Sequence, residues 1–225
     1  MKRTRTKTKA IDELVKVMAR LRSPTGCPWD REQDHHTLRW HAVEEVYELM
    51  DAIEAGDDHE MAEELGDLLL QVVFHCQMAK ERGAFDFEKV ARNIVNKLIR
   101  RHPHVFGDSK AKTVDAVWTQ WEQIKKAEKQ GTRHERASAL DGVPRHLPAL
   151  LRAEKLVKKA SKAGLLTVRA KAGAGRAEVG KRLFELAVYS QQRGWSAEEL
   201  LRRETQNAER ALRKKERERA GTRSR

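Results

Sequence analysis

The sequence has little of what several classes of protein require. Its 225 residues include only two cysteines, Cys27 and Cys76, which argues against a disulfide framework or a cysteine zinc site and favours a reducing, cytoplasmic location. No apolar run reaches the roughly 18 residues that a membrane-spanning helix needs. The basic N-terminus is not followed by an apolar stretch, so it does not predict a secretory signal.

Two common kinds of catalytic machinery are missing as well. The chain has no glycine-rich phosphate-binding loop and no Ser/His/Asp signature. His102 and His104 are a weak indication of a different metal-dependent phosphohydrolase, because no acid-paired histidine motif accompanies them. The chemistry is therefore expected to come from other residue types.

Glycine and proline are sparse, and no segment alternates apolar and polar residues with the period of a strand. Apolar residues recur instead at helical spacing, so the fold class is predicted to be all-α. Thr37 and Asp86 are expected to cap two of the helices. Helices are predicted at 10–22, 38–55, 58–82, 87–101 and 113–129, with two or three more beyond the linker and a break at 170–175.

The chain is predicted to divide into four parts. A disordered basic tail over residues 1–9 precedes a first helical domain at 10–129. A linker that contains two glycines and two prolines follows at 130–150. The remainder, 151–225, is predicted to be a second helical region with a basic C-terminal tail.

The net charge of +12 is unevenly distributed, which weakens a nucleic-acid interpretation. Residues 1–150 hold 25 basic and 25 acidic residues, whereas residues 151–225 hold 21 and 9. The basic tail is expected to be a solvated helix face that frays, with phosphate or RNA contact as the alternative. Residues 41–67, by contrast, carry eleven acids and no lysine or arginine.

These acids include two short clusters at helical spacing. The first holds Glu44, Glu45 and Glu48, and the second holds Glu64 and Asp67. Each cluster has a pair at i, i+3, which share one face of a helix. The first cluster taken alone is typical of a solvated amphipathic face. The second lies in a helix that apolar residues surround almost completely, which predicts that this helix is buried.

Carboxylates in a buried helix need a partner, since burying an unpaired charge is costly. The polar stripe along the 58–82 helix consists of Glu64, Asp67, Gln71 and His75. Converging carboxylates make the oxygen-rich site that Mg²⁺ prefers and, through Mg²⁺, a site for phosphate esters. A salt bridge to Arg100 or Arg101 is the alternative.

Residues 64–77 and 178–191 are similar at an offset of 114 positions, so the chain resembles two copies of one helical unit. The second copy has Lys181 where the first has Asp67, and it has no counterpart of the Glu44–Glu48 cluster. Glu178 and Lys181 are expected to pair with each other without a metal. The second half is therefore predicted to be structural.

The pattern E-E-x-x-E followed by E-L-G-D resembles the MazG nucleoside triphosphate pyrophosphohydrolases. The other segments that agree are at 26–30, 101–106, 121–125, 138–144 and 147–150. The match is strong over about 10–165 and weak over 166–215. The resemblance implies an all-α fold built on a four-helix bundle, in which antiparallel helix pairs dimerise. It also implies hydrolysis of NTPs and dNTPs to the monophosphate and pyrophosphate, with Mg²⁺ or Mn²⁺ as cofactor.

The resemblance also implies roles for particular residues. Metal ligands would be Glu45, Glu48, Glu64 and Asp67. Glu44 would be a further ligand, or the residue that orients and deprotonates the attacking water. Contacts to the nucleotide would come from Lys97, Arg101, Trp121 and Lys125. Trp121 would stack on the base, although a tryptophan at this position is equally typical of a core or an interface.

Three functions follow from these observations. The first is a Mg²⁺-dependent NTP pyrophosphohydrolase, with the clearing of aberrant nucleotides as its role and the first half as its active part. The second is a non-catalytic nucleotide- or metal-binding regulator, and the third is a basic helical nucleic-acid-binding protein. The expected partners are nucleoside triphosphates and a second copy of the chain in a homodimer or higher homo-oligomer. Neither nucleic acid nor a membrane is expected as a partner.

Overall fold

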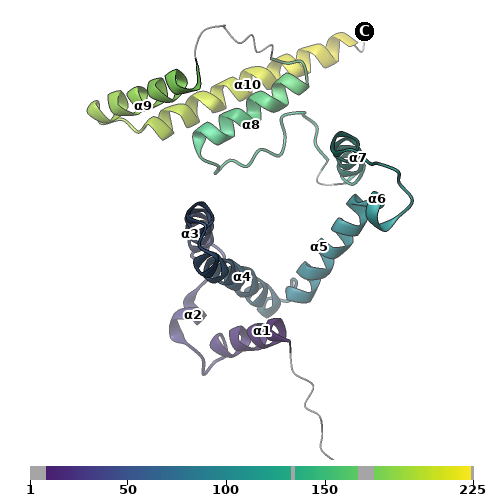
Figure 1. The fold of residues 1–225 in the computed structure, drawn as a ribbon, viewed down its shortest axis with the longest axis vertical. Coiled ribbons are helices and arrows are strands. Elements are labelled where there is room, and N and C mark those ends of the chain that lie inside the picture. The colour runs from purple at the N-terminus through teal and green to yellow at the C-terminus, as the bar shows by residue number, and fades with distance from the viewer. Residues whose placement is uncertain (1–8, 133–134, 167–174, 224–225) are drawn as a thin grey trace, which may run out of the picture. The chain divides into compact units, whose positions relative to one another are not determined.

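The computed structural model describes residues 9–132, 135–166 and 175–223, and these ranges contain ten α-helices and no strand. The all-α prediction is confirmed. The chain divides into two compact units, residues 1–121 and 122–225, which are described separately (Figure 1). Nearly all of the predicted N-terminal tail and of the break at 170–175 lies outside the described residues.

Most helices of the first unit begin and end close to the predicted positions. They are α1 (Ala10–Leu21), α2 (Pro28–Glu32), α3 (His41–Ala55), α4 (Asp58–Glu81), α5 (Phe87–Arg101) and α6 (Pro103–Phe106), with α7 (Val114–Ala127) crossing into the second unit. The short helices α2 and α6 were not predicted. The second unit contains α8 (Ala149–Lys162), α9 (Arg176–Gln192) and α10 (Ala197–Arg223). No helix in the described ranges combines the length and the apolar character needed to cross a membrane.

Local signals in the sequence define the hairpin of α3 and α4. Gly56 ends α3 with a φ of 67°, in the left-handed region that favours glycine. The side chain of Asp57 then accepts hydrogen bonds from the first backbone N–H groups of α4. Asp86 caps α5 in the same way, by accepting from the N–H of Lys89 at 2.9 Å, as predicted.

The predicted start of α3 at Thr37 is wrong. The Asp34 carboxylate accepts hydrogen bonds from the backbone N–H groups of His36 and Thr37, and the Thr37 hydroxyl accepts from the N–H of Asp34. Such local bonds compete with helical ones and hold this segment in a turn. Helix α3 therefore begins at His41, behind Trp40, which provides no side-chain cap.

The core of the first unit lies between α1, the turn before α3 and the C-terminal half of α4. Its buried side chains are Met18, Leu38, Val73, Phe74 and Met78. Gly26 allows the chain after α1 to turn back closely, because a Cβ there would lie 2.0 Å from the carbonyl oxygen of Leu21. The motif around Gly26 thus has a packing reason that its sequence did not reveal.

The prediction that α4 is buried throughout is wrong for this single chain. Its C-terminal half is buried, but Leu65 is 50% exposed and Leu69 is 39% exposed. The reason is that α1 and the turn before α3 cover only one end of this 24-residue helix. The other end packs on α3 and leaves an apolar face in solvent.

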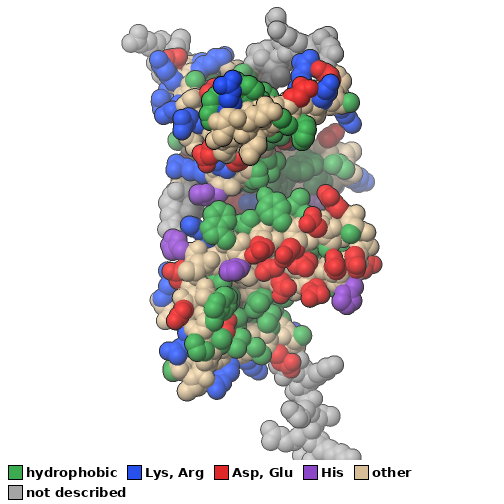
Figure 2. All heavy atoms as spheres, turned by 90° about the vertical axis from the view of Figure 1, so that its left-hand side faces the viewer, with side chains coloured by type: hydrophobic (Ala, Val, Ile, Leu, Met, Phe, Trp, Pro, Cys, Tyr) green, Lys and Arg blue, Asp and Glu red, His purple; other side chains and the backbone are tan. Residues whose placement is uncertain are grey.

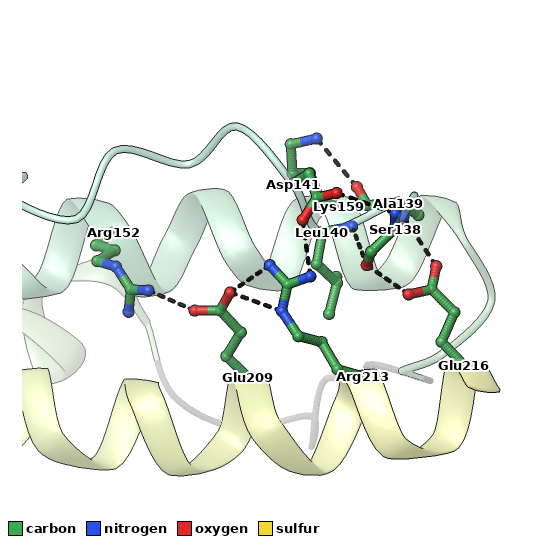
Figure 3. Close-up of polar contacts among 9 residues, drawn as sticks. All are labelled: Ser138, Ala139, Leu140, Asp141, Arg152, Lys159, Glu209, Arg213 and Glu216. Carbon is green, nitrogen blue, oxygen red and sulfur yellow. Dashed lines mark hydrogen bonds and ion pairs between the residues drawn. The ribbon is translucent and has the colours of Figure 1, made fainter. Parts of the chain in front are cut away.

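In the second unit, α8 packs on α10 around Leu140, Leu156, Ala160 and Leu165. Helix α10 also binds residues 138–141, which lie within the predicted linker (Figure 3). Glu216 accepts hydrogen bonds from the Ser138 hydroxyl and from the N–H of Ala139. Lys215 and Arg219 of α10 donate to the backbone carbonyls at 165 and 164, so part of the predicted solvated tail packs on the second unit, although most of its side chains are exposed.

His35 and His75 form a stacked pair that joins the turn before α3 to α4. Their Nδ1 atoms lie 2.8 Å apart and their rings are nearly parallel, with centroids 5.1 Å apart. One Nδ1 must donate to the other, so both rings cannot carry a proton there. Burial, reinforced by the neighbouring His35, lowers the pKa of His75 below its ordinary value of 6.5.

We expect this pair to make stability depend on pH. A lowered pKa means that the folded state favours neutral His75, so its contribution to stability is present above pH 6.5 and is lost as the pH falls below it. The double substitution His35→Phe and His75→Phe keeps two rings but removes the titration. Urea unfolding at pH 8 and pH 5 should show a smaller loss of stability in this variant than in wild type. Equal losses would contradict the prediction.

Candidate functional site

The hairpin of α3 and α4 brings the predicted acids together. Carboxylate oxygens of Glu45, Glu48 and Glu64 all lie within 4.8 Å of one another, and we call these three residues the acidic cluster. Among the described residues, no other set of three acidic, histidine or cysteine side chains meets this condition. Figure 2 shows acidic side chains gathered over α3 and α4, with apolar side chains exposed beside them.

The acids of the cluster repel one another. Burial raises the pKa of Glu45 above its ordinary value of 4.5, and the charge of Asp67 raises it further. Burial also raises the pKa of Glu64, followed by the charges of Glu48 and Asp67. The charged groups that shift both pKa values are all acidic, so Glu45 and Glu64 each face like charges.

This arrangement has a cost in stability near neutral pH. A carboxyl group with a raised pKa contributes stability below its unfolded value of 4.5, and that contribution is lost as the pH rises through the folded value. A bound cation would favour the charged carboxylates and offset the loss. The geometry is therefore better suited to holding an ion than to stabilising the fold.

The donor atoms fit a hard divalent cation. Every ligand that the cluster offers is a carboxylate oxygen, which suits Mg²⁺ or Mn²⁺ better than a metal that prefers nitrogen or sulfur. One oxygen of Glu64, Oε2, is buried and accepts no hydrogen bond. Buried polar atoms normally have a partner, so this orphaned oxygen is consistent with a ligand at the cluster.

The other two predicted acids are not part of the acidic cluster. Asp67 is half-buried on α4, and its charge acts on both Glu45 and Glu64, although its oxygens fall outside the group of three. Glu44 is exposed on α3 and lies 3.7 Å from Nδ1 of His41. Glu44 is thus accessible to solvent.

The predicted nucleotide-binding residues fall into different places. Lys97 is exposed on α5. Arg101, at the end of α5, is buried with its guanidinium 5.1 Å from the ring centroid of Trp121. Trp121 also meets the ring of Trp118 edge-on. Lys125 belongs to the second unit and lies 3.8 Å from Glu122.

Gln71 was not assigned to the site from the sequence, yet it contacts the cluster. It lies on α4 and donates a hydrogen bond from Nε2 to Oε1 of Glu45 at 3.3 Å. Its position four residues after Asp67, on the same polar stripe, is the signal in the sequence that pointed to it.

The second copy of the repeated segment, in α9, has a different pairing from the predicted one. Glu178 pairs with Arg182 at 2.8 Å, and Lys181 pairs with Glu185 at 3.8 Å. The prediction of a Glu178–Lys181 pair is therefore wrong, because opposite charges at i, i+4 were available to both residues. These exposed pairs within one helix need no metal.

Comparison with known proteins identifies a family that this sequence resembles. Residues 33–106, which include α3, α4 and α5, match the model of the MazG nucleotide pyrophosphohydrolase domain. The chain is 51% identical over 156 residues to a nucleoside triphosphate pyrophosphohydrolase of Escherichia coli strain K12. The aligned residues are 68% of this chain and 58% of that protein. This chain is also 49% identical over 154 residues to the nucleoside triphosphate pyrophosphohydrolase/pyrophosphatase MazG of Thermotoga maritima, with the same coverage.

A further relative matches over more of its length. An uncharacterized 26.1 kDa protein of Streptomyces cacaoi is 46% identical over 192 residues, which are 84% of this chain and 76% of that protein. Among solved structures, a mazG-related protein from Thermotoga maritima is similar with a TM-score of 0.44 and 25% identity, over 51% of this chain and 98% of that chain. The chain thus spans little more than half the length of the pyrophosphohydrolases named above.

Proposed function

Because this chain belongs to the MazG family, we propose that it hydrolyses nucleoside triphosphates, dNTPs included, to the monophosphate and pyrophosphate at the acidic cluster. One observation carries the proposal: oxygens of three carboxylates lie within 4.8 Å of one another although the charges of Glu48 and Asp67 raise the pKa values of Glu45 and Glu64. A nucleoside triphosphate is itself strongly negative, so it would be repelled by such a cluster unless a divalent cation lay between them.

The cofactor we propose is Mg²⁺, with Mn²⁺ able to replace it. Glu45, Glu48 and Glu64 would hold the ion, and Asp67, whose charge acts on Glu45 and Glu64, would be a further ligand. When bound, such an ion polarises a phosphate oxygen and lowers the pKa of water. The clearing of aberrant nucleotides is the cellular role that we propose for this activity.

The chain's own residues would carry the remaining steps. Glu44, exposed on α3, would orient a water molecule and accept its proton. The water oxygen would bond to the α-phosphorus, and the bond from that phosphorus to the bridging oxygen would break to release pyrophosphate. Lys97 and Arg101 would neutralise the outer phosphates, and Trp121 and Lys125 would contact the rest of the nucleotide.

The experiment is an assay of pyrophosphate release from a panel of NTPs and dNTPs with Mg²⁺, with Mn²⁺ and with EDTA. We expect release that depends on the divalent ion. Nucleotide binding without release would favour a regulator instead. Salt-sensitive RNA binding would favour the third hypothesis, which is weakened because basic residues of α10, such as Arg213 and Lys215, are engaged in contacts within the second unit.

We also propose that the chain forms at least a homodimer. Apolar side chains are exposed along both helices of the hairpin: Val43, Val46, Met50 and Ile53 on α3, and Leu65, Leu69 and Val72 on α4. A row of apolar side chains of this kind on a soluble domain is typical of an interface. A second copy would supply a matching apolar face, since a twofold interface uses the same patch on both subunits.

Sedimentation should therefore give a mass above 25.9 kDa at micromolar concentration. The double substitution Met50→Glu and Leu69→Glu is expected to reduce it to the monomer mass, because it places charges on the apolar faces of both helices. Val114→Glu, at an apolar residue that is 73% exposed at the start of α7, is the matched control. A wild-type chain that sediments as a monomer would overturn the proposed dimer.

A further inference from the structure

Gln71 is buried where a polar side chain needs a reason. It is 7% exposed on α4, and burying an amide without hydrogen bonds is costly. Its Nε2 group donates to Oε1 of Glu45 across the hairpin. An amide in the opposite orientation would place two oxygens together, so the chemistry of Glu45 fixes which end of Gln71 faces the cluster.

Two buried oxygens near this contact lack a donor. They are Oε1 of Gln71 and Oε2 of Glu64. Each belongs to a side chain that lies beside Glu45, one as its hydrogen-bond donor and the other as its neighbour in the cluster. Buried acceptors are rarely left without a partner, so each of these oxygens indicates a donor or a cation that binds there.

We propose that Gln71 is a positioning residue of the acidic cluster, which holds Glu45 toward Glu48 and Glu64 so that the three carboxylates can bind one divalent cation. This inference rests on the proposed function. Gln71 does not touch the reacting atoms itself. It acts through Glu45, in the way that hydrogen-bond partners of metal ligands orient those ligands in other proteins.

The residue type suits this task. A lysine or arginine at position 71 would pair with Glu45 and cancel charge that the cation requires. An apolar residue would leave the Glu45 carboxylate without a fixed direction. An amide donates one hydrogen bond while it remains neutral, so it orients the carboxylate and leaves its charge available.

Gln71→Met tests the proposal, because methionine keeps the length and the burial but cannot donate. We expect the dissociation constant for Mn²⁺, measured by calorimetry on the full chain without nucleotide, to rise by about 10-fold or more. Gln77→Met is the matched control. Gln77 lies on the same helix and donates an equivalent bond to Glu81 at 3.0 Å, away from the cluster.

The outcomes separate this inference from the proposed function. If wild type and Gln71→Met bind Mn²⁺ equally while both are folded, the role of Gln71 is overturned and the proposed function stands. If wild type binds no Mn²⁺, both are overturned. Should Gln71→Met melt well below wild type, Gln71→Asn retains the amide but is too short to reach Glu45, and it is expected to weaken Mn²⁺ binding without nucleotide in the same way.

Discussion

Glu48→Gln is expected to reduce pyrophosphate release by more than about 100-fold, because it removes charge from a direct ligand and even supporting residues cost roughly 10–100-fold. The same substitution should raise the melting temperature of the metal-free protein. The charge of Glu48 raises the pKa of both Glu45 and Glu64, so its removal relieves repulsion in the folded state. A gain in stability together with a loss of activity is the signature of a functional acid rather than a structural one.

The measurements are the pyrophosphate assay and a thermal melt in EDTA. Glu54→Gln, at an exposed acid on the same helix outside the cluster, is the control and should change neither. Retention of activity by Glu48→Gln would show that the cluster is not the active site. Loss of activity together with a lowered melting temperature would instead indicate that Glu48 supports the fold.

Glu209→Ala is expected to destabilise the second unit by about 3–5 kcal/mol, because it would leave a buried cation unpaired. Glu209 accepts from Arg152, whose side chain is only 6% exposed, and from Arg213 (Figure 3). Burial raises the pKa of Glu209, but hydrogen bonds from Arg213 and Arg152 outweigh this effect and hold the pKa below its ordinary value. Two nitrogens of Arg152 already lack partners, so nothing nearby would replace the carboxylate.

Urea unfolding followed by circular dichroism measures this loss, with Glu185→Ala as the control. Glu185 pairs with Lys181 on the surface of α9, where both side chains are well exposed and a single ion pair contributes little. A Glu209→Ala variant as stable as Glu185→Ala would show that the buried pair does not stabilise the unit. Since the pKa of Glu209 is lowered, its contribution should also be present above pH 4.5 and fall away in more acidic solution.

The elements that the sequence predicted well are those whose ends carry their own signals. Gly56, Asp57 and Asp86 each set a helix end through bonds to residues within a few positions, so the pattern alone was sufficient. Thr37 has the same chemistry as a cap, but Asp34 uses it in a turn. The choice between a helix cap and a turn depended on how the neighbouring Leu38 packs into the core, which is a tertiary contact that the local sequence does not contain.

In the candidate site, too, local patterns in the sequence predicted some features and tertiary contacts determined the others. The acids at 45, 48 and 64 could be placed on facing helices from their spacing, and the structure brings those three together. Whether α4 is buried within one chain could not be deduced from its composition. The same apolar residues on a helix face are expected whether that face packs into a core or against a second copy of the chain. The role of Gln71 depends on a contact across 26 positions, which no local pattern contains.

The contacts between the loop at 138–141 and α10 affect the order in which the two units can fold during synthesis. Contacts among α1, α3, α4 and α5 are complete once residue 101 has left the ribosome, so the first unit can fold while synthesis continues. Ser138 donates to Glu216 across 78 positions, and Asp141 accepts from Arg213 across 72, so both bonds form only some 75 residues after the loop has been made. At about 5–20 residues per second, the loop is made roughly 4–15 s before its partners in α10, so the first unit has that time to fold before the second can.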